Sequence, residues 1–301
     1  MLTQKIVRVE PRDDFVLTPE IDAVCRRATT YLDAGYACHF SGSAGTGKTT
    51  IAMHLANRRG RPVALMFGDD AFESSDLVGQ EKGLHSTKVT DNFVRTVTKT
   101  EEFRRPHWVD SGLTTACRHG HTLVYDEFSR SRPEANNVLL TILEERILSV
   151  PDPQNAGACV RVHPEFRAIF TSNPEDYAGV HKTQNALLDR MITIDLDYYQ
   201  RDTEAAITAA RAGVDLPLAR SVVDLVRQVR AAVSTQRPTL RASIMIARIV
   251  RQMGGASALE GSMFADACLD ILHPGTERSE ATRAAARRVI FSALDAQRQQ
   301  A

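Results

Sequence analysis

A glycine-rich segment at residues 42–49, GSAGTGKT, has the residue types and spacing of a phosphate-binding loop. It fits the pattern G-x-x-x-x-G-K-[ST] at every defined position. Glycines let consecutive backbone N–H groups turn inward around phosphate oxygens, and a helix N-terminus adds a partial positive charge. Lys48 would reach the β- and γ-phosphates of a nucleoside triphosphate, and the Thr49 hydroxyl would bind Mg²⁺. The residues expected to contact the nucleotide here are Gly42, Ser43, Ala44, Gly45, Thr46, Gly47, Lys48, Thr49 and Thr50.

The segments on either side of this loop have the context that the pattern requires. An apolar run at residues 37–40 predicts a strand before the loop. Apolar residues at helical spacing predict a helix after it, namely Ile51, Ala52, Leu55 and Ala56. Strand, turn and helix in this order favour a phosphate site over a glycine-rich turn without a ligand.

A second candidate site is Asp126-Glu127, which ends the apolar run at residues 122–125. Asp126 could hold the hydration shell of Mg²⁺, and Glu127 could act as the general base for an attacking water. Taken alone, the pair is equally compatible with a strand that stops at a solvated acidic turn. Both candidate sites lie at carboxyl ends of predicted strands, where open α/β sheets bind ligands, so the functional interpretation is favoured.

The apolar runs alternate with helical patterns along the first two thirds of the chain. Further strands are predicted at residues 63–67, 168–173 and 191–196, and a helix begins at Pro133. Near-continuous apolar strands argue for a parallel sheet that is covered on both faces. Beyond about residue 200 only helical patterns remain.

Composition excludes some classes of protein. The 301 residues carry 37 basic and 37 acidic side chains, so bulk charge does not indicate a nucleic-acid binder. No apolar run approaches the ~20 residues of a membrane span, and the N-terminus has no signal-peptide pattern. The five cysteines are scattered, which fits reduced thiols in the cytoplasm, and Cys117, His119 and His121 are interpreted as structural.

The residues together resemble a known family. The phosphate loop, Asp126-Glu127 and the TSNP segment at residues 171–174 occur in the order found in AAA+ ATPases, and residues 187–191 (LLDRM) resemble the MoxR branch. Longer segments are similar to the gas vesicle protein N family: residues 68–70 with 75–79, residues 125–137 and residues 173–182. The resemblance covers about residues 12–235 and implies a P-loop AAA+ core at residues 1–200 with a smaller α-helical lid domain at residues 201–301.

The resemblance also implies roles for individual residues. Asn173 matches the sensor 1 residue, which bonds to the γ-phosphate or the attacking water. Arg190 matches the arginine finger, which reaches the ATP of a neighbouring subunit, and Arg241 resembles sensor 2 on the lid. Arg130 and Arg132 could also face a neighbour's nucleotide, and the sequence does not rank them against Arg190.

Two inserts, at residues 80–112 and 149–165, are similar to the helix 2 insert and the pre-sensor 1 hairpin of the MoxR group. Such loops crowd the central pore of a ring. Trp108, the single tryptophan, is interpreted as a core aromatic side chain rather than a substrate contact.

The function implied by this family is ATP hydrolysis with Mg²⁺ in gas vesicle assembly or growth. The expected protein is a cytoplasmic ring, a hexamer, that remodels or delivers shell or accessory proteins, in the cytosol or on the vesicle. Two alternatives stay open. One is a MoxR-type chaperone for another cytosolic client with a von Willebrand A partner. The other is a nucleotide-gated binding module, against which Glu127 argues because a pure switch needs no base.

Overall fold

The computed structural model describes residues 4–7, 14–91, 99–150, 159–173, 185–233, 237–255, 259, 262–272, 287–288 and 291–292. Its contacts divide the chain into two compact units. Unit 1 consists of Met1–Glu10, Ala28–Ser41 and Ile51–Ile194, and unit 2 consists of Pro11–Arg27, Gly42–Thr50 and Asp195–Ala301. The domain boundary expected at residue 200 stays a prediction.

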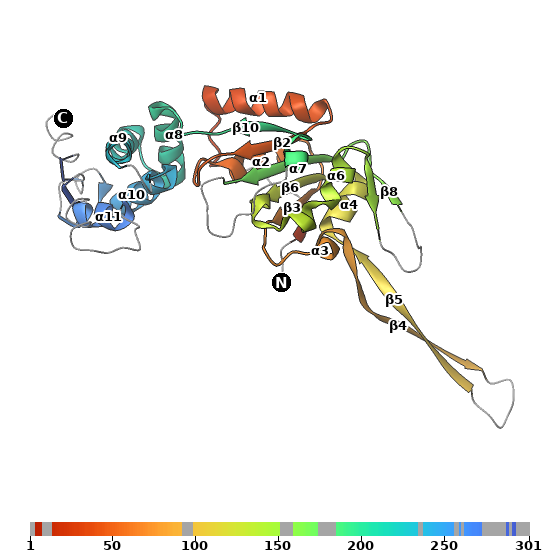
Figure 1. Ribbon diagram of the computed structural model, residues 1–301. Helices are drawn as coiled ribbons and strands as arrows, with labels where there is room; N and C mark the ends of the chain where they lie inside the picture. The colour runs from red at the N-terminus through yellow and green to blue at the C-terminus, as the bar shows by residue number, and fades with distance from the viewer. Residues whose placement is uncertain are drawn as a thin grey trace. The chain divides into compact units, whose positions relative to one another are not determined.

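Unit 1 is built on a six-stranded sheet with the strand order β1-β3-β6-β9-β2-β10 (Figure 1). The strands are β1 (Gln4–Val7), β2 (Ala37–Ser41), β3 (Val63–Phe67), β6 (Thr122–Asp126), β9 (Arg167–Ser172) and β10 (Met191–Asp195). The pairs β3–β6, β6–β9 and β9–β2 are parallel, whereas β1 adds to the edge antiparallel to β3. The five predicted strands are confirmed, and the sheet flanked by helices confirms the α/β fold class.

Helices cover this sheet and build its core. They are α1 (Pro19–Asp33), α2 (Lys48–Arg58), α3 (Ser74–Val78), α4 (Gly112–His119), the 3₁₀ turn η1 (Phe128–Arg130), α5 (Pro133–Asn136), α6 (Val138–Leu143) and α7 (Asn185–Leu188). The helix predicted from Pro133 onward is divided into α5 and α6. Asn137 between them keeps helical backbone angles (φ −56°, ψ −31°), so the division is a short interruption in hydrogen bonding rather than a turn.

The strand register aligns the ends of the central strands. Ser41 of β2 pairs with Ser172 of β9, and Tyr125 of β6 pairs with Phe170 of β9. The carboxyl ends of β2, β6 and β9 therefore lie at the same edge of the sheet. Because the phosphate loop follows Ser41 directly, it begins at the edge where Asp126 ends β6, the usual position of ligands in parallel α/β sheets.

An antiparallel hairpin overlaps each of the two predicted inserts. The first is formed by β4 (Gly79–Asp91) and β5 (Lys99–Asp110), which extend from the sheet unit as a long two-stranded arm (Figure 1). The second is formed by β7 (Ile147–Ser149) and β8 (Cys159–Arg161), although most of β7 precedes the second predicted insert. Residues 92–98 and 151–158 of these inserts lie outside the described residues.

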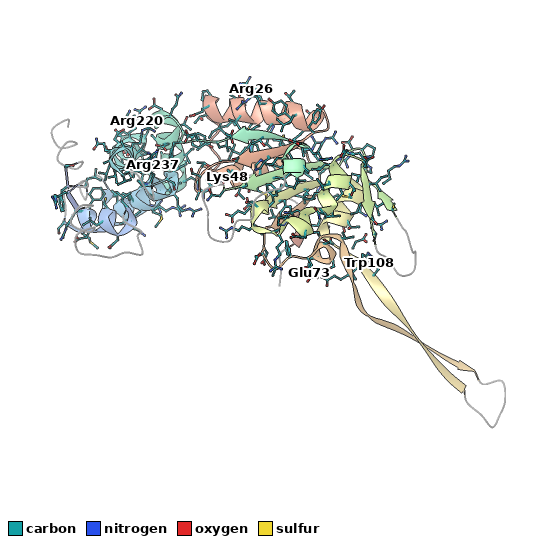
Figure 2. The ribbon with its side chains drawn as sticks, viewed as in Figure 1. Arg26, Lys48, Glu73, Trp108, Arg220 and Arg237 are labelled. Carbon is teal, nitrogen blue, oxygen red and sulfur yellow. The ribbon has the colours of Figure 1, made fainter. Side chains whose placement is uncertain are left out.

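Trp108 lies where the arm joins unit 1 (Figure 2). Its side chain is partly buried and packs against the hydrophobic core, and its ring N–H donates to Asp110 Oδ1 at 2.9 Å. A Cβ atom on Gly79 would lie 2.7 Å from the Trp108 ring, so this glycine admits the indole. These contacts confirm the interpretation of Trp108 as a core aromatic side chain.

Helices make up the last part of unit 2, as the sequence predicts (Figure 1). They are α8 (Arg201–Ala212), α9 (Leu216–Ala232), α10 (Leu240–Gln252) and α11 (Ser262–Leu272). The sequence explains why α9 begins where it does. The Asp215 side chain caps the helix by accepting from Leu218 N at 3.0 Å, and Pro217 occupies the first turn, where it needs no N–H partner. Apolar residues of all four helices form one buried cluster. Among the described residues, no helix has the length and apolarity that a membrane span requires.

Candidate functional site

The predicted phosphate loop connects β2 to α2, which begins at Lys48. Three of its glycines have positive φ, and at two of them a neighbouring segment also leaves no room for a side chain. Gly42 has φ +152°, and a Cβ atom there would lie 2.1 Å from Leu196 O. Gly45 has φ +80°, and a Cβ atom there would lie 2.5 Å from Thr239 Oγ1. At both positions the backbone angles and the close neighbours exclude other residues, which accounts for the glycines there.

Lys48 lies inside this loop (Figure 2). Its side chain is 8% exposed, and Nζ donates to Gly42 O at 2.6 Å and to Ser43 O at 2.7 Å. Thr46 Oγ1 also donates to Ser43 O, at 2.9 Å. The ammonium is thus held within the loop at the N-terminus of α2, where the helix dipole favours an anion. Thr49 is exposed in the first turn of that helix.

A single hydroxyl links the two acidic residues at the end of β6. The Thr171 hydroxyl of β9 donates to Asp126 Oδ1 at 2.5 Å, and Thr171 Oγ1 in turn accepts a hydrogen bond from Glu127 N at 2.9 Å. Thr171 is fully buried and Asp126 is 8% exposed. Because β6 and β9 are neighbours in the sheet, this hydroxyl can fix both the Asp126 carboxylate and the backbone of Glu127. In the sequence, Thr171 is distinguished only by its place in the TSNP segment.

Glu127 has a backbone conformation that side chains rarely adopt. Its φ of 52° and ψ of 41° place it in the left-handed region, at a cost of about 1–3 kcal/mol. Gly68 permits this turn, since a Cβ atom on Gly68 would lie 2.0 Å from Glu127 O, and Gly68 N donates to Asp126 O at 2.8 Å. The Glu127 carboxylate is paired with Arg130. Such strain is typical of functional positions, so it supports the prediction for Glu127.

The turn after Glu127 is fixed by Tyr125, whose hydroxyl oxygen lies 2.7 Å from Ser131 Oγ and 3.2 Å from Asn136 Oδ1, so that its one proton can be donated to either. Burial raises the pKa of Tyr125 to about 12, so the hydroxyl keeps its proton at neutral pH. Ser131 Oγ also accepts from Asp69 N at 3.0 Å. This network connects the segments at residues 69, 125, 131 and 136 around the turn that follows the acidic pair.

Asn173, the predicted sensor 1 residue, follows β9 directly and is 6% exposed. The strand end before it is supported by His39, which lies in β2. His39 Nε2 is 2.8 Å from Ser172 Oγ, and Nδ1 is 3.0 Å from Thr193 Oγ1. The His39 ring also packs edge-on against Phe128, with centroids 5.3 Å apart. His39 therefore connects β2 to β9 and β10 beside Asn173 and contacts the turn after Glu127, a role that its apolar sequence context does not reveal.

Thr171→Val is expected to lower the turnover number for ATP about 10- to 100-fold with little change in nucleotide affinity, because it removes a hydrogen bond to a charged carboxylate. Thr122→Val is the matched control. Thr122 lies on the adjacent strand β6, and its buried hydroxyl has no hydrogen-bond partner in the described part of the chain. Steady-state hydrolysis and equilibrium binding of both variants check this prediction, and equal turnover in the two variants would contradict it.

The three arginines proposed to act on a neighbour's nucleotide each pair with a carboxylate of their own chain. Arg190 Nε donates to Glu144 Oε2 at 2.7 Å, and its Nη1 donates to Ala186 O at 2.5 Å. The other two pairs are Arg130 with Glu127 and Arg132 with Asp70. Arg190 is the least exposed of the three, at 29% of its side chain against 48% and 59%.

Arg241, the predicted sensor 2 residue, is the second residue of α10 and is exposed. Thr239 occupies the N-cap position of that helix without a side-chain capping hydrogen bond, and it packs on Gly45 of the phosphate loop. The start of the helix that carries Arg241 is therefore in contact with the loop, although the role of Arg241 stays a prediction.

Comparisons with known proteins identify the family. The AAA domain family (dynein-related subfamily) matches residues 39–191. The gas vesicle ATPase GvpN of Ancylobacter aquaticus is 47% identical over 296 residues, which cover 97% of this chain and 83% of that protein. The chain belongs to the gas vesicle ATPase GvpN family. It is therefore an AAA+ ATPase related to gas vesicles, which implies nucleotide binding.

More distant relatives agree with this assignment. The gas vesicle ATPase GvpN of Haloferax mediterranei is 41% identical, covering 86% of this chain and 74% of that protein. Protein CbbQ of Hydrogenophilus thermoluteolus is 26% identical over 61% of each chain, which supports the predicted resemblance to the MoxR branch. The crystal structure of NtrX from Brucella abortus with ADP shares the fold, with a TM-score of 0.52 at 15% identity over 92% of this chain and 61% of that chain.

Proposed function

We propose that this chain is a Mg²⁺-dependent AAA+ ATPase that acts in gas vesicle assembly or growth by remodelling or delivering shell or accessory proteins. The observation that carries the proposal is its similarity to the GvpN of Ancylobacter aquaticus over 97% of the chain. The acidic turn fixed by Thr171 adds chemical support, because a nucleotide-gated binding module would not need a strained and positioned Glu127.

In this proposal, residues 42–47 surround the phosphates with their backbone N–H groups, and Lys48 neutralises charge on the β- and γ-phosphates. Glu127 accepts the proton of the attacking water. Asn173 orients that water or the γ-phosphate, since an amide can donate and accept. Arg241 would bind the nucleotide from the lid.

The residues proposed to hold Mg²⁺ fit that ion. Mg²⁺ is usually bound by one or two carboxylates together with substrate phosphates and water, so it needs no cage of protein ligands. Asp126 offers a mostly buried carboxylate whose orientation is fixed by Thr171, and Thr49 offers a hydroxyl. When bound, the ion neutralises charge that develops on the phosphates. Asp126 would act on it through bound water.

The proposed active form is a ring of six identical subunits, in which Arg190 acts on the ATP of the neighbouring subunit. An arginine finger supplies a permanent charge in a planar fork suited to phosphate oxygens. This assembly is supported by the family, and the partners proposed for the ring are the proteins of the vesicle shell or their accessory factors.

Lys48→Ala should weaken nucleotide binding about 100-fold or more, because it removes a charged hydrogen-bonding group from the loop. Cells that carry only this variant should then make few vesicles, or small ones, while the shell protein is still expressed. Electron microscopy of the cells, with immunoblotting of the shell protein, checks both points. Arg26→Ala, which removes an exposed cation on α1, is the control and should support normal vesicles. Normal vesicles with Lys48→Ala would overturn the proposal and favour a structural role.

A further inference from the structure

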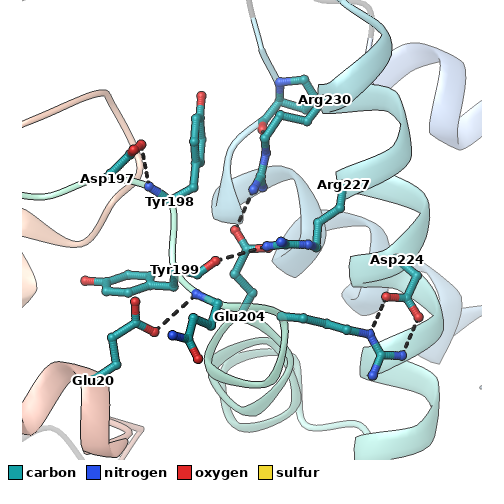
Figure 3. A network of polar contacts seen from close by, with 11 residues as sticks. Glu20, Asp197, Tyr198, Tyr199, Glu204, Asp224, Arg227 and Arg230 are labelled. Atoms are coloured by element: carbon teal, nitrogen blue, oxygen red, sulfur yellow. Dashed lines mark hydrogen bonds and ion pairs between the residues drawn. The ribbon is translucent and has the colours of Figure 1, made fainter.

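Unit 2 contains a buried carboxylate that nucleotide chemistry does not explain. Glu204 of α8 is 1% exposed and accepts from two arginines of α9, Arg230 Nη1 at 2.8 Å and Arg227 Nη1 at 3.1 Å (Figure 3). Arg230 is also buried, with 8% of its side chain exposed. Burying charges is costly even when they are paired, and a hydrophobic replacement often gives equal stability. The cluster of Glu204, Arg227 and Arg230 therefore invites a role beyond stability.

Both arginines also bind the backbone of segments outside α8 and α9. Arg227 Nη1 donates to Tyr199 O at 3.0 Å, and Arg230 Nε donates to Pro238 O at 2.7 Å. The Arg230 guanidinium lies 4.1 Å from the centre of the Tyr198 ring. Without the Glu204 carboxylate between them, the two guanidinium groups would repel each other and lose the geometry of these bonds.

The two segments held in this way are the ones that touch the phosphate loop. The Tyr199 hydroxyl donates to Thr46 O at 2.8 Å, and Thr239, next to Pro238, packs against Gly45. Burial raises the pKa of Tyr199 above its usual range, so the hydroxyl keeps the proton that it donates. Gln200 N donates to Glu20 Oε2 at 3.1 Å, which holds the same segment from α1 (Figure 3).

We infer that Glu204 is a positioning residue for nucleotide binding: through Arg227 and Arg230 it holds Tyr199 and Thr239 against the phosphate loop. The inference rests on the proposed phosphate site. Packing of the loop before the nucleotide arrives lowers the ordering cost of binding. A cluster that only stabilised the helices would leave nucleotide affinity unchanged.

The same two helices provide a matched control. Arg201 of α8 and Asp224 of α9 form a bidentate ion pair at 2.5 Å for both bonds, with side chains 48% and 30% exposed. This pair joins α8 to α9 as the buried cluster does, and within the described part of the chain it makes no bond to Tyr199 or Pro238 (Figure 3). Asp224→Asn therefore tests the loss of an α8–α9 ion pair by itself.

The experiment measures the Kd for a fluorescent ATP analogue and the thermal midpoint of the nucleotide-free full chain. Glu204→Gln and Tyr199→Phe should each raise the Kd about tenfold, as expected for one hydrogen bond lost from a binding-competent loop. Asp224→Asn should leave the Kd within about twofold of the wild type, since an exposed pair contributes little. An unchanged Kd in a folded Glu204→Gln protein would overturn the inference.

A double-mutant cycle keeps the inference testable if Glu204→Gln does not fold. Arg227→Gln removes the bond to Tyr199 O, and Tyr199→Phe removes the bond to Thr46 O. If the two substitutions break the same chain of contacts to the loop, the Kd of the double variant should be no higher than the higher of the two single-variant Kd values. Kd increases that simply multiply would contradict a shared path. Lys48→Ala, measured in parallel, separates the two proposals, because wild-type affinity there would refute the phosphate site itself.

Discussion

Glu127→Gln is expected to bind ATP as tightly as the wild type and to lose nearly all hydrolysis. The amide has the shape of the carboxylate but cannot accept the proton of the attacking water. The loss of a positioned general base lowers turnover by about 10²–10⁴-fold. Equilibrium binding and single-turnover hydrolysis, measured on the same preparation, separate the two effects.

The control for this prediction is Glu134→Gln, which changes an exposed carboxylate in α5, seven residues further along the chain. That variant should hydrolyse ATP at the wild-type rate. Wild-type turnover in Glu127→Gln would mean that another group takes the proton, and the strained backbone of Glu127 would then need a different explanation.

Arg190→Ala should produce a comparable loss for a different reason. A finger that acts in trans contributes roughly 10³–10⁵ in rate in related phosphoryl-transfer systems. The variant should therefore bind ATP normally and turn it over slowly. To reach a neighbour, Arg190 would exchange Glu144, its carboxylate partner within the chain, for the neighbour's phosphate oxygens.

Mixing experiments identify the arginine that acts in trans. Arg190→Ala mixed with Glu127→Gln should regain part of the activity, because each subunit supplies the group that its neighbour lacks. Arg130→Ala and Arg132→Ala, tested in the same way, show whether either is the finger instead. A strict monomer with full activity, independent of protein concentration, would contradict the ring.

The parts of the site that lie on contiguous segments could be predicted from the sequence. The phosphate loop needs glycines at fixed spacing, and the five central strands are apolar over their whole length because both faces of the sheet are covered. Each of these strands lies within one or two residues of its predicted position. The edge strand β1 was missed, since a strand of four residues has too little periodicity to be recognised.

Contacts between distant segments could not be predicted in this way. Thr171 can bond to the Asp126 carboxylate only because β9 lies beside β6 in the folded sheet. The sequence around a threonine in a strand does not show which residue of the neighbouring strand lies next to it. Glu204 reads as an ordinary acidic residue in the first turn of a helix. In the fold, Glu204 is buried between Arg227 and Arg230. In the sequence, the spacing of three residues places these two arginines on the same side of α9 and gives no other indication of a buried partner.

The most direct test of the central claim uses Glu127→Gln in cells rather than in solution. This variant keeps the nucleotide and loses the turnover, so it separates an ATP-driven process from a nucleotide-gated binding role. Electron microscopy should be combined with immunoblots that show unchanged levels of this protein and of the shell protein. An ATP-driven role predicts that these cells make few vesicles, or small and immature ones. Vesicles of normal size and number in that strain would contradict it.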